Sequence, residues 1–115
     1  MSRSRAIGTA WESAIVDFLR TRGWPTAERR AMGGANDRGD IAGVIGIVIE
    51  AKNARTIDLA SWWREAEQER ANDRARHAVL WLKRRGKSSA GDGWVVMDGE
   101  TLVELLHEAG YGGGE

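Results

Sequence analysis

Residues 39–52, GDIAGVIGIVIEAK, decide the fold that we expect for this chain. They include its longest apolar run, from Ile41 to Ile49, which has an acid at each end. This run is far shorter than the roughly 20 residues that a membrane span needs. Its β-branched residues and its glycines instead predict two short strands, 40–44 and 46–52, which are close enough to form a hairpin.

The two acids at the ends of this run are the first sign of a functional site. If the chain turns at residues 44–46, Asp40 lies across from Glu50, with Cβ atoms about 5 Å apart. Like charges placed in this way are destabilising unless a cation lies between them. Because side chains alternate along a strand, Val48, Glu50 and Lys52 share one face, so Lys52 projects beside the two carboxylates. A register slip of one residue would undo this arrangement.

The segments on either side of the hairpin alternate between helical and extended patterns. Helices are expected at 9–22, 58–76 and 99–109, further strands at 24–32, 78–83 and 93–97, and a glycine-rich loop at 33–39. In the last helix, Leu102, Leu105 and Leu106 are expected to face inward. The order α-β-β-β-α-β-β-α predicts one α/β domain over residues 1–115, with a central mixed β-sheet flanked by helices and a flexible tail at 110–115.

The first helix carries one acid in an unusual position. Its apolar stripe is centred between Trp11 and Leu19, and Glu12 falls inside that stripe. A carboxylate on a buried face is costly, although a long side chain at the edge of a stripe can also reach water. If Glu12 points inward, it joins Asp40, Glu50 and Lys52 in an otherwise apolar layer.

Three carboxylates beside one lysine suit a Mg²⁺ ion, which prefers one or two carboxylates, several waters and a phosphate oxygen of the substrate. The implied reaction is metal-assisted hydrolysis of a phosphodiester, in which Lys52 orients the attacking water and stabilises charge on the phosphate. We therefore expect Glu12, Asp40 and Glu50 to be metal ligands and, together with Lys52, to be the catalytic residues. Mn²⁺ is expected to substitute for Mg²⁺.

These residues resemble the signature of the PD-(D/E)xK nucleases. Gly39-Asp40 followed by Glu50-Ala51-Lys52 is similar to that signature, with Gly in place of Pro, and Glu12 is similar to its upstream helical Glu. The spacing in so short a chain looks most like the archaeal-type Holliday junction resolvases and their phage relatives. The resemblance covers about residues 6–106 in element order. It implies a restriction-endonuclease-like fold, four-way DNA junctions as the substrate and a homodimer.

The charges are distributed unevenly along the chain, although the formal net charge is zero. From Ser88 to Glu115 there are six acids and no Lys or Arg, which leaves a charge of +6 on the first 87 residues. Such segregation suits a protein that binds a polyanion, and it also occurs on proteins that bind none. The residues expected to contact DNA phosphates are Arg29, Arg30, Arg38, Arg84, Arg85 and Lys87.

The long helix at 58–76 carries features that admit two interpretations. Its acids at 65, 67 and 69 alternate with arginines, which is most simply a solvated face, although Glu65 or Gln68 could approach the site. Trp62 and Trp63 differ by about 100° around the helix, so one of them contributes to a subunit interface or both belong to a wide core-facing stripe.

The composition excludes several other classes of function. The chain has no Cys, which excludes disulfides, thiolate zinc sites and cysteine nucleophiles. No apolar signal segment follows Met1, so we expect a cytoplasmic protein without a membrane partner, in the host cytoplasm if a phage encodes it. Two alternatives to a resolvase stay open: another DNA nuclease of this fold, of the nicking or restriction type, and a non-catalytic DNA-binding module. The intact set of acids and lysine disfavours the second.

Overall fold

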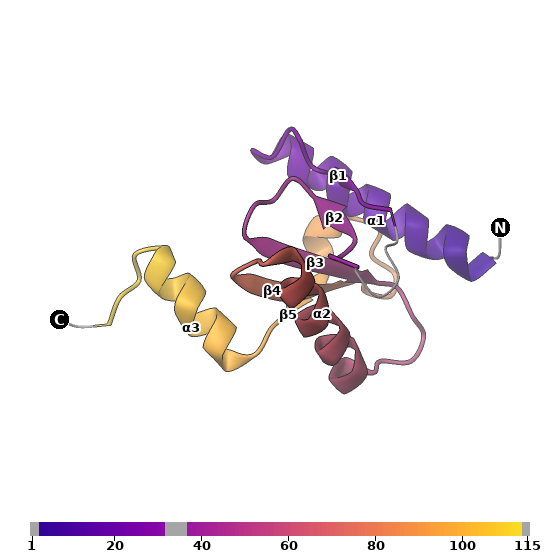
Figure 1. Cartoon of the computed structure of the whole chain (residues 1–115). Helices are drawn as coiled ribbons and strands as arrows, with labels where there is room; N and C mark the ends of the chain where they lie inside the picture. The colour runs from indigo at the N-terminus through magenta and orange to yellow at the C-terminus, as the bar shows by residue number, and fades with distance from the viewer. Residues whose placement is uncertain (1–2, 32–36, 114–115) are drawn as a thin grey trace.

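The computed structural model describes residues 3–31 and 37–113, and within these ranges the side chains from residue 6 onward. Its elements are α1 (Arg3–Thr21), β1 (Glu28–Arg29), β2 (Ile41–Ala42), β3 (Ile47–Lys52), α2 (Leu59–Asp73), β4 (His77–Leu82), a 3₁₀ turn η2 (Ala90–Asp92), β5 (Trp94–Val96) and α3 (Gly99–Glu108) (Figure 1). Within the described part of the chain, no helix is long and apolar enough to cross a membrane.

A mixed three-stranded sheet forms the centre of the domain. Its strand order is β3-β4-β5, with β4 parallel to β3 and antiparallel to β5. Helix α2 connects the two parallel strands, as a crossover between parallel neighbours requires. The predicted α/β class, with a mixed sheet and flanking helices, is therefore confirmed.

The predicted hairpin of 40–44 with 46–52 was wrong in its pairing. The two short strands β1 and β2 pair with each other in a separate antiparallel sheet. Between the predicted hairpin strands, the Asp40 N–H donates to the Ile49 carbonyl at 3.0 Å, and no continuous ladder joins them. Gly43 explains the change of partner, because a Cβ there would lie 2.5 Å from the Thr26 carbonyl oxygen, so only glycine lets these backbones approach.

The strand predicted at 24–32 is shorter in the structure, where, among the described residues 24–31, only Glu28–Arg29 (β1) is extended and paired. A turn around Pro25 precedes β1, and the Ala27 N–H donates to the Trp24 carbonyl at 3.1 Å. Residue 32 of that strand and residues 33–36 of the predicted glycine-rich loop lie outside the described residues.

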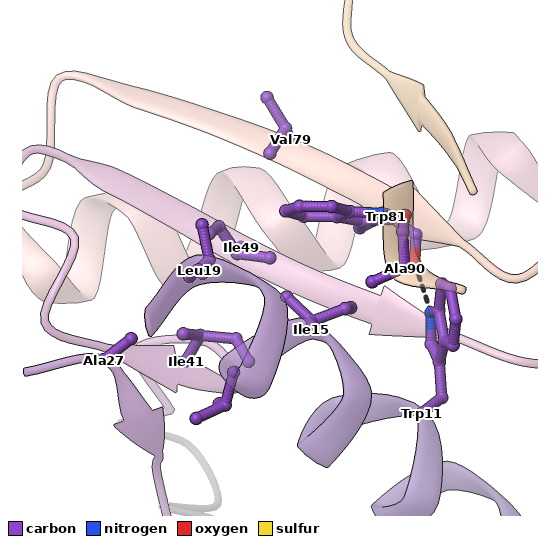
Figure 2. Packing of buried hydrophobic residues seen from close by; sticks show 10 residues of the cluster. Trp11, Ile15, Leu19, Ala27, Ile41, Ile49, Val79, Trp81 and Ala90 are labelled. Carbon is purple, nitrogen blue, oxygen red and sulfur yellow. Dashed lines mark hydrogen bonds between the residues drawn. The ribbon is translucent and has the colours of Figure 1, made fainter. Parts of the chain in front are cut away.

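The two faces of the central sheet carry separate cores. Helix α1 packs on one face, where Trp11, Ile15 and Leu19 meet Ile49 and Trp81 of the sheet (Figure 2). The Trp11 indole N–H donates to the Trp81 carbonyl oxygen at 3.0 Å, the bond drawn dashed in Figure 2. A buried indole with a satisfied donor fixes the helix along the strands, and with it the position of the acid at residue 12.

Helix α2 covers the opposite face. Its Ala66 packs with Val48 of β3 and Leu80 of β4, and both Trp62 and Trp63 are half-buried against this cluster. The two tryptophans therefore belong to a wide core-facing stripe of α2.

Helix α3 lies apart from both cores, and the prediction that its leucines face inward was wrong (Figure 1). Leu102 is 47% exposed and Leu106 is 39% exposed, while Leu105 is half-buried. Glu108 ties the end of the helix to the body through His77 at 2.7 Å and Arg76 at 3.1 Å.

The tail predicted at 110–115 begins as an ordered helix end. The N–H groups of Gly110 and Tyr111 donate to the carbonyls of His107 and Leu106, and Gly110 has the positive φ typical of a residue that ends a helix. Residues 114–115 lie outside the described residues.

Candidate metal centre

Asp40 is fixed at the edge of β3 by two hydrogen bonds to the backbone of that strand. Its Oδ2 accepts a hydrogen bond from the Ala51 N–H at 2.8 Å, and its own N–H donates to Ile49. Gly39 precedes it with a φ of 97°, and a Cβ there would lie 2.8 Å from Val48 Cγ1. Because proline is restricted to φ near −65°, proline could not take this backbone conformation at residue 39.

Glu50 is buried in the interior of β3, with only 4% of its surface exposed. As alternation along the strand predicts, Ile49 faces α1 whereas Val48, Glu50 and Lys52 face α2. Glu50 Oε2 lies 3.3 Å from Lys52 Nζ, while Glu50 Oε1 is buried and accepts no hydrogen bond. A buried carboxylate oxygen without a donor is unstable unless a proton or a cation satisfies it.

Two further acids of α2 complete the cluster, and they were not among the predicted site residues. Glu65 Oε1 lies 2.6 Å from Lys52 Nζ, and Glu69 is 3% exposed with an Oε1 that has no hydrogen-bond partner. One oxygen from each of Glu50, Glu65 and Glu69 lies within 4.8 Å of the others. These three residues, the three-acid group, can therefore hold a metal ion.

The sequence did contain a signal for Glu69. It follows Trp62 by seven residues and Ala66 by three, so it falls within the apolar stripe of α2. The same argument that marked Glu12 on the first helix would have marked Glu69 as an inward-facing acid. Glu65 precedes it by four residues and therefore lies one turn away on the same side of the helix.

Burial changes the proton affinity of these carboxyls. It raises the pKa of Asp40 to about 6 and the pKa of Glu69 to about 7. The pKa of Glu50 is raised well above its usual range by burial, by a hydrogen bond that its protonated form gives to Glu65, and by the charge of Asp40. Desolvation of the charged form is the main cause at all three residues, so without a cation this cluster retains protons.

Lys52 is the cationic partner of the cluster. Burial alone would lower its pKa, but the hydrogen bond with Glu65 and the charge of Glu50 raise the pKa of Lys52 above its usual value. Its ammonium also lies 5.7 Å from the centre of the Trp62 ring. Lys52 is therefore charged, and it is held towards α2 by Glu65.

Glu12 lies close to the cluster but outside the three-acid group. Its Oε1 accepts a hydrogen bond from Arg29 Nε at 3.0 Å, and its side chain is half-buried. The charge of Glu12 contributes to the raised pKa of Asp40, which places the two carboxylates in electrostatic reach of each other. The structure thus brings Asp40, Glu50 and Lys52 together and leaves Glu12 at the margin, paired with an arginine.

The predicted DNA-binding residues fall into two sets. Arg29 pairs with Glu12, while Arg30 and Arg38 contact Asp73 at 3.4 and 3.8 Å, so their charges are partly compensated. By contrast, Arg84 stacks over Trp94 at 4.1 Å, and Arg85 and Lys87 are exposed.

A basic pocket is lined by residues that directly follow β3 and β4 in the chain. It has a volume of about 150 Å³ and is lined by Asn53, Ala54, Arg55, Lys83, Arg84, Arg85 and Gly86. It opens at the carboxyl ends of the parallel strands β3 and β4, where the Lys83 N–H donates to the Lys52 carbonyl at 3.0 Å. Arg55, Asn53 and Lys83 were not among the predicted contacts. The pocket gathers the positive charges of Arg55, Lys83, Arg84 and Arg85.

Comparisons of the chain with protein-family models, with curated proteins and with solved structures find no match. The likeness to the PD-(D/E)xK signature therefore rests on the residues of this chain alone.

Proposed function

We propose that this protein is a metal-dependent, structure-specific DNA endonuclease with a restriction-endonuclease-like fold, and that it resolves four-way junctions. The observation that carries the proposal is the cluster of Asp40, Glu50 and Lys52, in which a buried carboxylate oxygen has no partner. Carboxylate oxygens such as those of Asp40 and Glu50 fit a hard divalent cation, and Lys52 lies beside them.

The cation of this proposal is Mg²⁺, with Mn²⁺ able to replace it. Asp40 and Glu50 would hold the ion, with Glu12 close enough to support it through a water. When bound, the ion supplies a polarised phosphoryl oxygen and a more acidic water. Lys52 would orient that water and stabilise charge on the phosphate, while the basic pocket would hold the neighbouring phosphate of the backbone.

The substrate is tested by comparing cleavage of a four-way junction, a linear duplex and a flap, each of matched sequence, in Mg²⁺. The proposal expects symmetric cuts near the junction centre and much slower cleavage of the duplex. Preferential nicking of the duplex or of the flap would favour another nuclease of this fold. Binding without cleavage of any of the three, in Mg²⁺ and in Mn²⁺, would favour a non-catalytic DNA-binding module.

DNA binding should depend on the basic pocket through charge. Each phosphate that a protein neutralises contributes about −0.9 to the slope of log K against log salt on duplex DNA. The double substitution of Arg84 and Arg85 by Ala is therefore expected to make the slope shallower by about 1.8 for every sequence, measured by fluorescence anisotropy in EDTA. Arg22→Ala, which removes an arginine stacked on Phe18 of α1, is the control and should leave the slope unchanged. A double variant with the wild-type slope would exclude the pocket from the DNA interface.

The working unit is expected to be a homodimer, because a four-way junction has approximate two-fold symmetry and is cut on two strands. Since Trp62 and Trp63 pack in the core, the exposed apolar face of α3 is the better interface candidate. Sedimentation at micromolar concentration should give twice the chain mass of 12.6 kDa.

Aspartate in place of Val103 should shift the dimer towards monomer, because a charge in an apolar interface is costly. Glu104→Gln, a substitution at the neighbouring exposed position, is the control and should leave the balance between dimer and monomer unchanged. A wild-type protein that stays monomeric, also on junction DNA, would contradict the dimer and favour a nicking enzyme.

A further inference from the structure

Glu50 belongs to two groups of carboxylates at once. It interacts with Asp40 at the edge of β3 and also with Glu65 and Glu69 of α2. The proposed catalytic ion uses only the first group. Glu65 and Glu69 have no part in it, although Glu69 is almost fully buried.

The α2 side of the cluster has the features of a cation site in its own right. Both Glu50 and Glu69 bury an Oε1 that accepts no hydrogen bond. The oxygens of the three-acid group lie within 4.8 Å of one another, and two oxygens that share a cation at about 2.1–2.6 Å are at most about 4–5 Å apart. The spacing of Glu65 and Glu69 also places like charges one turn apart on a helix, which is destabilising without a counter-ion.

Lys52 alone does not neutralise this group. Its ammonium contacts Glu65 at 2.6 Å and Glu50 at 3.3 Å, and neither contact reaches the unpartnered oxygens. The single positive charge of Lys52 therefore contacts two acidic side chains, while Glu69 and Asp40 add two more acids to the same cluster.

We propose that Glu50, Glu65 and Glu69 bind a second divalent cation, and that Glu50 bridges it to the ion held with Asp40. Two cations that share a carboxylate lie about 3.5–4 Å apart in enzymes that cleave phosphodiesters. The role of this second ion in the reaction rests on the proposed nuclease function, whereas its binding does not.

The test counts cations on the full-length protein by calorimetric titration with Mn²⁺ alone, after removal of metal with EDTA. Wild type is expected to bind two ions per chain. Glu69→Gln should eliminate one of them or weaken it at least about tenfold, and Glu65→Gln, at a more exposed position that tolerates change, should act in the same direction. Glu67→Gln is the matched control on α2, because Glu67 pairs with Arg70 outside the group, and it should bind two ions.

A Glu69→Gln variant that binds as many Mn²⁺ ions as wild type, with unchanged affinity, would overturn the second site. Failure of the nuclease proposal gives a different pattern. If no DNA is cleaved but Glu69→Gln still removes one Mn²⁺, the cation site stands without the catalytic function. If DNA is cleaved while Glu69→Gln and Glu65→Gln leave Mn²⁺ binding unchanged, only the second site is wrong.

Discussion

Asn in place of Asp40, or Gln in place of Glu50, is expected to slow Mg²⁺-dependent cleavage of junction DNA by about 10²–10³-fold or more. Each substitution removes a ligand charge from an ion whose electrostatic contribution is several kcal/mol, and each 1.36 kcal/mol corresponds to a factor of ten in rate. Single-turnover cleavage of a labelled junction measures the effect. Binding to the same junction in EDTA should be nearly unchanged, because the phosphate contacts proposed above come from arginines outside the cluster.

The same two variants should be at least as stable as wild type in the absence of metal. The amide introduced by Glu50→Gln can donate to Glu65 or Glu69, as the protonated Glu50 does, and Asp40→Asn removes a carboxylate whose charge repels its neighbours. Glu67→Gln serves as the control that leaves cleavage unchanged. Near-wild-type turnover in both variants would contradict the assignment of Asp40 and Glu50 to the site.

The metal-free protein is expected to lose stability as the pH rises from about 4.5 to about 7. The pKa of Asp40 is raised from 3.8 to about 6 and that of Glu69 from 4.5 to about 7 in the folded state. Within this range the folded protein holds protons that the unfolded chain has released, so the free energy of unfolding falls with pH. The stabilising contribution is complete below the unfolded pKa values and is lost above the folded ones, with a size of several kcal/mol at about 1.36 kcal/mol for each unit by which a pKa is raised.

Urea unfolding at pH 5 and pH 8 in EDTA measures this loss. Glu69→Gln should reduce it, since one of the carboxyls with a raised pKa is then removed. Saturating Mg²⁺ should restore stability at pH 8, because a cation replaces the protons. A free energy of unfolding that rises with pH in EDTA, or one that Glu69→Gln leaves equally pH-dependent, would contradict the burial of these acids.

The core of the site was predictable from the sequence because it depends on local alternation. Glu50 and Lys52 are two residues apart on one strand, so they share a face in any register. The position of Asp40 beside them was also predicted, but through a hairpin that does not form. What holds Asp40 in place is its own pair of hydrogen bonds to the backbone of β3, at Ile49 and Ala51.

The remainder depended on contacts between elements that are distant in the sequence. Glu65 and Glu69 join the site because α2 crosses from β3 to β4 over the face that carries Glu50. From the sequence, the alternation of acids and arginines along α2 indicated that these acids face solvent. The pairing of Glu12 with Arg29 depends on where the two-residue strand β1 runs. The apolar residues of α3 predicted a helix face that is buried against the core. An amphipathic pattern does not specify whether the same chain or another chain covers that face.

The most direct test of a metal-dependent nuclease site at Asp40 and Glu50 is a Mg²⁺ titration of junction cleavage by wild-type protein freed of metal with EDTA. The account predicts no cleavage by wild type before Mg²⁺ is added, and activity that rises and saturates as Mg²⁺ is added. At every Mg²⁺ concentration that saturates wild type, Asp40→Asn should stay at least about 10²-fold slower. Cleavage that persists in EDTA, or a wild-type protein that binds the junction and leaves it intact in both Mg²⁺ and Mn²⁺, would contradict it.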